Sequence, residues 1–324
     1  MTWPKEYGGH QRSAIERYVL LEELLAAGAP VGAHWIADRQ SGPALLKFGT
    51  EHQRRKYLPG MARGEIFCCI GMSEPNAGSD LASVRTRAEK LADGRWKLNG
   101  QKIWTTQAHR CRLMIGLVRS GGFDEKAKHL GLSQFLIELD TPGITIEPIV
   151  DLVGDSHFCE VFFEDVILGP ECLLGAEGAG WKQCTSELSL ERSGPERYMS
   201  SMAVYLEFMR AAGPDPSESV RQALGRIAAD IWTLRQMSLS VAGQLAGGKD
   251  PSVEAAIVKD LGNTFEQSLP TLIQTLTEAG MQLEQDTDLM RTLGWLLQTS
   301  PSFSLRGGTR EILRGIIARG LGLR

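Results

Sequence analysis

The sequence predicts an α+β protein with N-terminal helices, a central antiparallel β-barrel or sandwich domain and a C-terminal four-helix bundle. The prediction depends on the spacing of apolar residues, which is helical up to about Glu65 and again after Gly180. Between about Phe67 and Asp165 the spacing changes to short β-like runs that turn residues separate. We therefore expect domains at residues 1–65, 66–175 and 176–324.

The first region has the pattern of amphipathic helices. Apolar residues recur at mostly three- and four-residue spacing, at Ile15, Tyr18, Val19, Leu21, Leu24 and Leu25. Gly28 and Pro30 predict the end of this helix. A second helical pattern covers residues 35–48, and Gly42-Pro43 predicts a break within it.

The middle region contains short runs of apolar and β-branched residues. Four of them lie at residues 96–99, 113–118, 134–139 and 158–163. Turn pairs accompany them at Asp93-Gly94, Gly121-Gly122 and Pro142-Gly143. Short strands with turn signals at such spacing are typical of an antiparallel barrel or sandwich.

The last region returns to the helical period and keeps it nearly to the end. Pro195, Gly213-Pro214 and Gly247-Gly248 predict the breaks between its helices. Four long helices packed together would bury their apolar faces against one another. From the periods alone, a β-barrel domain beside an unrelated helical domain is an equally good interpretation.

The composition excludes several classes of function. The chain has 324 residues, 42% of them hydrophobic, and a net charge of −4, which does not favour nucleic acid or an anionic membrane as partner. Its six cysteines lack CxxC spacing, so we expect neither a disulfide framework nor a metal site. Since no apolar run approaches ~20 residues and the first residues do not resemble a signal peptide, we expect a soluble, cytoplasmic protein.

Two sequence motifs indicate a candidate ligand-binding site. The run Ile70–Asp80 reads Ile-Gly-Met-Ser-Glu-Pro-Asn-Ala-Gly-Ser-Asp, and the run Asn99–Thr106 reads Asn-Gly-Gln-Lys-Ile-Trp-Thr-Thr. A flavin on a β domain needs backbone donors and an apolar wall for its ring. Gly71 and Gly78 would let the main chain approach such a ligand closely. Both runs resemble the flavin-binding signatures of the acyl-CoA dehydrogenase family, in the same order and at a similar distance.

The resemblance implies that the first motif binds FAD. It places Ile70, Met72 and Ser73 at the flavin, with the Ser73 hydroxyl in hydrogen-bonding reach of the pyrimidine end. Ser79 matches the position that contacts the cofactor phosphates and the pantetheine arm of the substrate, so it is both a cofactor-binding and a substrate-binding candidate.

The second motif supplies the remaining flavin contacts that the resemblance implies. Trp104 stacks beside the ring, and Thr106 donates a hydrogen bond to flavin N5. Thr309 belongs to the string Gly307–Arg314, which matches the segment that crosses the flavin. For Trp104 taken alone, an aromatic residue of the core is the better interpretation.

Further strings extend the resemblance along the whole chain, at residues 3–9, 160–166 and 174–181. Relatives generally place some ~50 further residues before the first of these strings, an addition that domains of this class accommodate. We expect either a truncated chain or an acyl pocket with a shortened wall.

The proposed reaction requires a carboxylate that removes a proton from the α-carbon of an acyl-CoA thioester. In most relatives it lies in a Glu-Gly-Thr run, where this chain has Gly307-Gly308-Thr309. A minority of relatives, among them isovaleryl-type enzymes, carry it on the first long helix after the β domain, just before an arginine. Glu191 occupies that position and is the candidate catalytic base.

Neighbours of Glu191 match substrate-binding positions of the family. These are Ser189 and Arg192, which the resemblance places near the CoA chain. The alternative is that Glu191 is a solvated helix residue paired with Arg192 or Arg197. The nearby carboxylates Glu187 and Glu196 are expected at the surface.

The resemblance also implies partners. Family members are dimers or tetramers in which a neighbouring subunit completes each FAD site. The motifs that the neighbour donates have only weak counterparts here, at residues 208–213 and 274–280. We therefore expect either a homo-oligomer or a hetero-oligomer with a paralogous subunit, and an electron-transfer flavoprotein as the electron acceptor.

The sequence is consistent with three functions. The first is an FAD-dependent acyl-CoA dehydrogenase that forms a 2,3-enoyl-CoA by α-proton abstraction and β-hydride transfer, with fatty acids or sterols as the degraded lipids. The second is a non-catalytic or half-site subunit of a hetero-oligomeric acyl-CoA dehydrogenase, which Gly307 favours. The third keeps the fold but reoxidises the flavin with oxygen, as an oxidase or monooxygenase.

Overall fold

A computed structural model describes residues 1–190, 192–277 and 287–323; the side chains of Ala33 and of residues 187–190 are not described. The chain forms two compact units. Unit 1 consists of Met1–Arg12 and Pro30–Leu190, and unit 2 of Ser13–Ala29 and Glu191–Arg324. The N-terminal helical region is therefore divided, because its first long helix belongs with the C-terminal helices.

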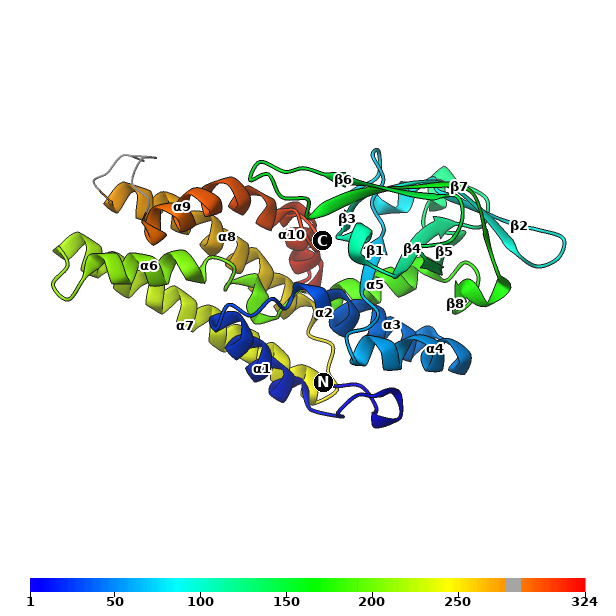
Figure 1. Cartoon of the computed structure of the whole chain (residues 1–324). Coiled ribbons are helices and arrows are strands. Elements are labelled where there is room, and N and C mark those ends of the chain that lie inside the picture. The colour runs from blue at the N-terminus through cyan, green and yellow to red at the C-terminus, as the bar shows by residue number, and fades with distance from the viewer. Residues whose placement is uncertain (191, 278–286, 324) are drawn as a thin grey trace. The chain divides into compact units, whose positions relative to one another are not determined.

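Unit 1 begins with short helices that cover one face of its sheet (Figure 1). They are η1 (Lys5–Tyr7), α2 (Gly32–Ile36), η2 (Ala37–Ser41), α3 (Gly42–Phe48) and α4 (Glu51–Ala62). α4 starts at a capping box, in which the Thr50 side chain accepts from the Gln53 backbone and the Gln53 side chain accepts from the Thr50 backbone.

The predicted break at Gly42-Pro43 is wrong, because the chain stays helical from α2 to α3. A π-helical turn, η2, precedes Pro43: the Gly42 N–H donates to the Ala37 carbonyl, so the helix is wider just before the proline, where a residue without an N–H is accommodated. Gly42 serves packing instead. A Cβ at this position would lie 1.9 Å from the buried Trp3 ring.

The β domain is an eight-stranded sheet with the order β6-β7-β3-β2-β4-β5-β8, and β1 pairs with β4. Its strands are β1 (Cys68–Gly71), β2 (Arg87–Lys90), β3 (Trp96–Thr106), β4 (Leu113–Arg119), β5 (Leu132–Glu138), β6 (Ile144–Ile149), β7 (Phe158–Leu168) and β8 (Leu173–Leu174). The four predicted runs coincide with β3, β4, β5 and β7. Most pairs are antiparallel, as predicted, while β1–β4 and β2–β4 are parallel.

Both faces of the central strand β4 are buried. Leu113 and Ile115 pack in a core with the helices of unit 1, whereas Met114 and Val118 pack in a second core around Trp96. Side chains alternate across a strand, so a strand covered on both sides reads as a continuous apolar run. The helix α5 (Gly180–Leu190) closes unit 1.

Unit 2 is helical. It contains α1 (Ala14–Ala26), η7 (Pro195–Arg197), α6 (Met202–Ala212), α7 (Glu218–Ala246), α8 (Ser252–Leu276), α9 (Asp288–Thr299), η8 (Ser300–Ser304) and α10 (Arg310–Gly320). The long helices α7 and α8 lie side by side, with α1 against α7 (Figure 1). The predicted breaks at Gly213 and Gly247 are confirmed, since α6 ends at Ala212 and α7 at Ala246. Among the described residues, no helix is long and apolar enough to span a membrane.

Polar contacts fix α1 to the helices of unit 2. The hydroxyls of Tyr18 and Tyr198 are hydrogen-bonded at 2.7 Å, and Arg235 binds Glu22 through Nε and Nη2 at 2.7 and 2.9 Å. Burial raises the pKa of Tyr18 to about 12, so both phenols stay protonated at neutral pH. The N-terminal helix is thus part of the C-terminal core.

Tyr198→Phe removes one hydroxyl of this pair and should destabilise unit 2 by about 1 kcal/mol, the usual net value of a buried hydrogen bond. Urea unfolding would measure the loss, and faster hydrogen exchange over residues 14–26 would localise it to α1. Tyr205→Phe is the control, because that ring is also buried but its hydroxyl makes no hydrogen bond in the described part of the chain. Equal effects of the two variants would contradict the assignment.

Candidate active site

The structure brings the two predicted flavin motifs together in unit 1. The Ile103 N–H donates to the Ser73 carbonyl at 3.0 Å. Lys102 Nζ donates to the Met72 carbonyl at 3.0 Å and binds Glu74 Oε1 at 2.8 Å. Met72 and Ser73 therefore lie directly beside the segment that leads to Trp104.

Glu74 and Lys102 form the buried ion pair that joins the motifs. The exposed fraction of their side chains is 9% and 0%. Glu74 also accepts the backbone N–H groups of Arg85 and Thr86, at 2.6 and 2.9 Å. Both charged residues lie within the two sequence motifs, but no role was predicted for either. The presence of a Glu in one motif and a Lys in the other could have indicated that the two motifs form an ion pair.

The pKa values of the pair follow from its burial. Burial pushes the pKa of Glu74 upward, but the charge of Lys102 and the hydrogen bonds from Lys102, Thr86 and Arg85 together leave that pKa below its ordinary value. Burial lowers the pKa of Lys102 to about 8, although the Glu74 carboxylate opposes the shift. Both groups are therefore charged at neutral pH.

Trp104 is held in an outward-facing position by a β-bulge. The β3–β7 register shifts between Lys102 and Thr105, and Trp104 has a φ of +58°, an uncommon value for a non-glycine residue. Its side chain is 56% exposed and meets Phe158 edge-on, with ring centroids 6.0 Å apart. The interpretation of Trp104 as a core aromatic is wrong, since the two residues that flank the bulge are buried and the indole is not.

The other predicted residues of unit 1 lie along the same elements. Ile70 is half-buried on β1 and pairs with Ile115. Thr106 ends β3 opposite Phe158. Ser79 is exposed, two residues after the tight turn in which Glu74 and Ala77 exchange backbone hydrogen bonds.

The segment after the first motif is fixed by Arg119. This buried guanidinium donates to the carbonyls of Ala82, Val84, Lys128 and Leu130 at 2.8–3.2 Å. Asp80 accepts from Ser83 and from Lys128 Nζ, the latter at 2.9 Å. The loop that carries Ser79 therefore has a defined conformation.

The residues predicted to act on the thioester belong to both units, with Ser79 and Ser189 in unit 1 and Arg192 in unit 2. Glu191 lies outside the described residues, and of Ser189 only the helical backbone of α5, in unit 1, is described. Arg192 is buried, and its Nε donates to the Gly307 carbonyl at 3.3 Å. Thr309 is the N-cap residue of α10.

The Gly307-Gly308 loop requires glycine. Its φ values are +66° and +100°, and the second lies in a region that residues with a Cβ rarely adopt. Lys259 Nζ donates to the Gly308 carbonyl at 3.0 Å, beside the contact of Arg192 with Gly307. Two buried cations therefore hold the loop in which most relatives are expected to carry a carboxylate.

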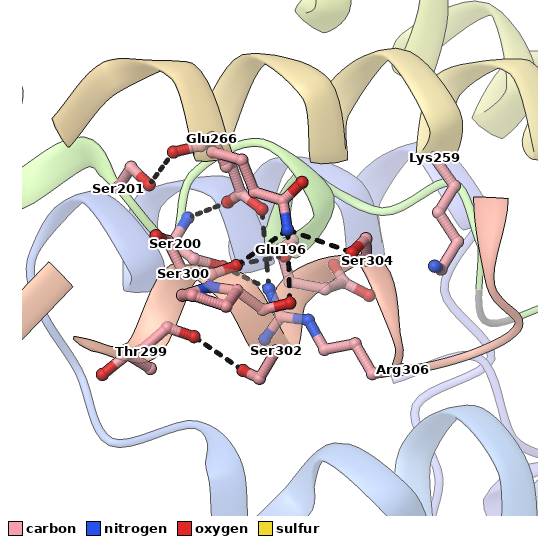
Figure 2. Close-up of polar contacts among 12 residues, drawn as sticks. Glu196, Ser200, Ser201, Lys259, Glu266, Thr299, Ser300, Ser302, Ser304 and Arg306 are labelled. Carbon is pink, nitrogen blue, oxygen red and sulfur yellow. Dashed lines mark hydrogen bonds and ion pairs between the residues drawn. The ribbon is translucent and has the colours of Figure 1, made fainter. Parts of the chain in front are cut away.

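A buried polar network adjoins this loop (Figure 2). The fully buried Glu266 accepts the Ser200 N–H at 2.6 Å and pairs with Arg306 at 3.5 Å, and Arg306 donates to the Ser200 hydroxyl at 2.9 Å. Burial raises the pKa of Glu266, although the nearby Arg306 opposes the shift. Sequence reasoning missed this network. Its expectation of a surface position for Glu196 is wrong, since that residue is only 3% exposed.

The structure thus combines a β domain that joins two sequence motifs with a helical unit that carries a fixed glycine loop. Three family models match the chain: the N-terminal domain of acyl-CoA dehydrogenase at residues 1–65, the middle domain at 69–166 and the C-terminal domain at 178–322. The chain belongs to the acyl-CoA dehydrogenase family, whose members are oxidoreductases that act on acyl-CoA.

Individual relatives agree with this assignment. Acyl-CoA dehydrogenase IpdE1 of Mycobacterium tuberculosis is 35% identical over 100% of this chain and 84% of its own length. Acyl-CoA dehydrogenase FadE34 of the same organism is 32% identical over 98% of this chain, which spans 44% of that longer protein. Among solved structures, the Tcur3481-Tcur3483 steroid ACAD has a TM-score of 0.90 and 29% identity, covering 100% of this chain and 85% of that chain.

Glu74→Gln should destabilise unit 1 by about 3–5 kcal/mol at pH 6, because it leaves the Lys102 cation buried without its partner. The variant also loses the group that raises the Lys102 pKa, so this pKa falls below about 8. The folded chain then binds fewer protons than the unfolded chain, in which lysine titrates near about 10.4, and its stability rises with pH. Urea unfolding at pH 6, 7.5 and 9 should show the deficit shrinking as pH rises.

The double variant Glu74→Gln/Lys102→Met is the control for this prediction. It removes the unpaired charge and keeps an oxygen for the Arg85 and Thr86 N–H groups, so it should recover most of the lost stability. A deficit that is independent of pH, or no recovery in the double variant, would show that the pair does not act through charge.

Proposed function

We propose that the chain is an FAD-dependent acyl-CoA dehydrogenase that desaturates the α,β-bond of an acyl-CoA thioester. The observation that carries the proposal is the linkage of the two motifs by Glu74 and Lys102, which fixes Met72 and Ser73 beside the outward-facing Trp104. A rigid, exposed indole next to a defined backbone segment suits a flat ring, and burial of that ring would cover the indole.

The residues of the β domain, which we delimit at 66–175, would hold the cofactor. Trp104 forms the wall, Ile70, Met72 and Ser73 border the ring, Thr106 provides a hydroxyl, and Ser79 provides another on the fixed loop. Thr309 contributes from the 176–324 domain. When bound, FAD supplies the acceptor for the hydride that leaves the β-carbon of the substrate.

Glu191 would remove the α-proton. A carboxylate in a dry pocket has a raised pKa and becomes an effective base near neutral pH. Arg192, its neighbour, is buried and donates to the Gly307 carbonyl, so the start of this helical region and the glycine loop are joined. Ser79, Ser189 and Arg192 are our candidates for binding the CoA chain, and an electron-transfer flavoprotein would receive the electrons.

The test is Glu191→Gln, with the purified protein loaded with FAD. The variant should keep its bound flavin, because the residue is a base and not a flavin ligand in this proposal. Its flavin should be reduced by acyl-CoA about 10²–10⁴-fold more slowly than in the unsubstituted protein, the usual contribution of a general base. Anaerobic stopped-flow absorbance at the flavin band measures this rate.

Glu218→Gln is the matched control, since Glu218 is exposed at the start of α7 and hydrogen-bonds Gln222. It should leave the reduction rate unchanged. Full reduction of the Glu191→Gln variant would refute the assignment of the base. Absence of any reduction in the unsubstituted protein, across short, branched, long and sterol-derived acyl-CoAs, would refute the dehydrogenase.

A second candidate is a half-site subunit of a hetero-oligomer. Gly307 supports this candidate, because a glycine stands where most relatives are expected to carry the catalytic carboxylate. The name of the similar Tcur3481-Tcur3483 steroid ACAD, which joins two gene products, supports it as well. Co-expression with a paralogue, followed by light scattering and measurement of flavin per chain, distinguishes the two. A homo-oligomer with one FAD per chain would exclude the half-site subunit.

A further inference from the structure

A row of uncharged residues crosses three strands of unit 1 beside Trp104. β7 lies between β3 and β6 in the sheet (Figure 1). Phe158 on β7 pairs with Thr106 on β3 and with Ile149 on β6. Side chains of directly opposite residues on neighbouring strands point to the same face and lie close enough to touch. Thr106, Phe158 and Ile149 therefore form one continuous row.

This row points away from the core of the β domain. The residues Cys159 and Val161 of β7 are fully buried in the core around Trp96. Because side chains alternate across a strand, Phe158 points to the opposite face. Phe158 is only half-buried there, and so is Ile149. The row is thus open on the side where Phe158 meets the exposed Trp104 ring.

The Phe158 ring is held between two other rings. Trp104 meets it edge-on with ring centroids 6.0 Å apart, and His157 meets it edge-on with centroids 4.7 Å apart. The Gln107 N–H donates to the His157 carbonyl at 2.9 Å, which joins the start of β7 to the residue after Thr106. The aromatic surface beside Trp104 therefore has a defined shape.

The angle between the rings favours a flat ligand. The planes of Trp104 and Phe158 are at 89° to one another. A flat ring that stacks on the indole is therefore also perpendicular to the phenyl ring, an edge-to-face arrangement that aromatic pairs favour. Ile149 continues this surface with an aliphatic side chain. The end of the ligand that lies here should be apolar.

The two sides of β3 differ in chemistry. On one side the backbone of the first motif adjoins it, since the Ile103 N–H donates to the Ser73 carbonyl. On the other side lie Phe158 and Ile149, which offer no polar side-chain atom. Neighbouring strands are about 4.8 Å apart, and three fused rings are longer than this spacing. A flavin with its polar end at Ser73 would thus extend past Thr106 onto β7.

We propose that Phe158 and Ile149 bind the apolar, dimethyl-substituted end of the flavin ring, with Phe158 as the second wall of a corner that Trp104 begins. The inference rests on the proposed FAD-dependent function and adds two cofactor-binding residues to it. Every residue that it uses belongs to unit 1.

The test compares FAD with an analogue that lacks both methyl groups of this end. The full-length chain, stripped of flavin in the oligomeric state in which it is isolated, is titrated with each while flavin fluorescence is followed. The unsubstituted protein should bind FAD about ten-fold more tightly, the value of burying two methyl groups. Phe158→Ala should lower this ratio to about three-fold or less, because the contact is lost.

Phe162→Ala is the matched control. Phe162 is half-buried on the same strand and the same face, where it pairs with Gln101 and Thr145. It lies four residues from Phe158, or about 13 Å along the strand. This variant should keep the ratio of the unsubstituted protein. Ile149→Ala, at the end of β6, should lower the ratio and serves as the second variant if Phe158→Ala does not fold.

The ratio separates a contact from a structural role. If Phe158 only supports the Trp104 ring, Phe158→Ala weakens both flavins equally, the ratio is unchanged and the inference is overturned. Equal affinity of the unsubstituted protein for the two flavins would overturn it as well, and so would an equal loss of the ratio in Phe162→Ala. If the unsubstituted protein binds neither flavin, the proposed FAD-dependent function itself is refuted.

Discussion

The buried pair of Glu74 and Lys102 is the interaction on which the arrangement of unit 1 depends. Burying two charges costs desolvation that their attraction barely repays, so such a pair is weak support for stability. Its effect here is positional. The pair and the Met72 carbonyl hold the first motif against β3, and Arg85 and Thr86 connect the following loop to the same carboxylate. The bulge at Trp104 follows at once, and a left-handed tryptophan persists only where its surroundings determine its backbone.

Unit 2 uses buried polar groups for the same purpose. Residues 306, 307 and 308 are each held by a buried ionisable side chain, from Glu266, Arg192 and Lys259 respectively. Glycine residues lose more conformational entropy on folding than other residues do. The three contacts offset this entropic cost of ordering the loop. In both units, a segment that carries predicted site residues is held in position by charged side chains and not by apolar packing alone.

The sequence predicted those features that have a local signal. The strands β3, β4, β5 and β7 follow from short apolar runs, and the helix ends at residues 212 and 246 follow from glycine. It did not predict the helical course through Gly42-Pro43, because the π-helical turn and the Trp3 ring that occupies the space beside Gly42 depend on tertiary packing. Nor could it divide the first region, since the bond between Tyr18 and Tyr198 joins residues far apart in the chain.

The candidate site shows the same limit more sharply. A row such as Lys259, Asn263 and Glu266 on one helix face ordinarily indicates a solvated surface, and the same rule misplaced Glu196. The row is buried because residues 196–201 and 306–308 cover it. Nothing in the local sequence of either segment predicts that it packs against this face of α8. Once it is covered, this polar face has to find its partners within the protein: Lys259 donates to the Gly308 carbonyl, and Glu266 pairs with Arg306. A face that served packing alone would be apolar throughout, so this polar row fixes the position of residues 306–308 through hydrogen bonds and charge.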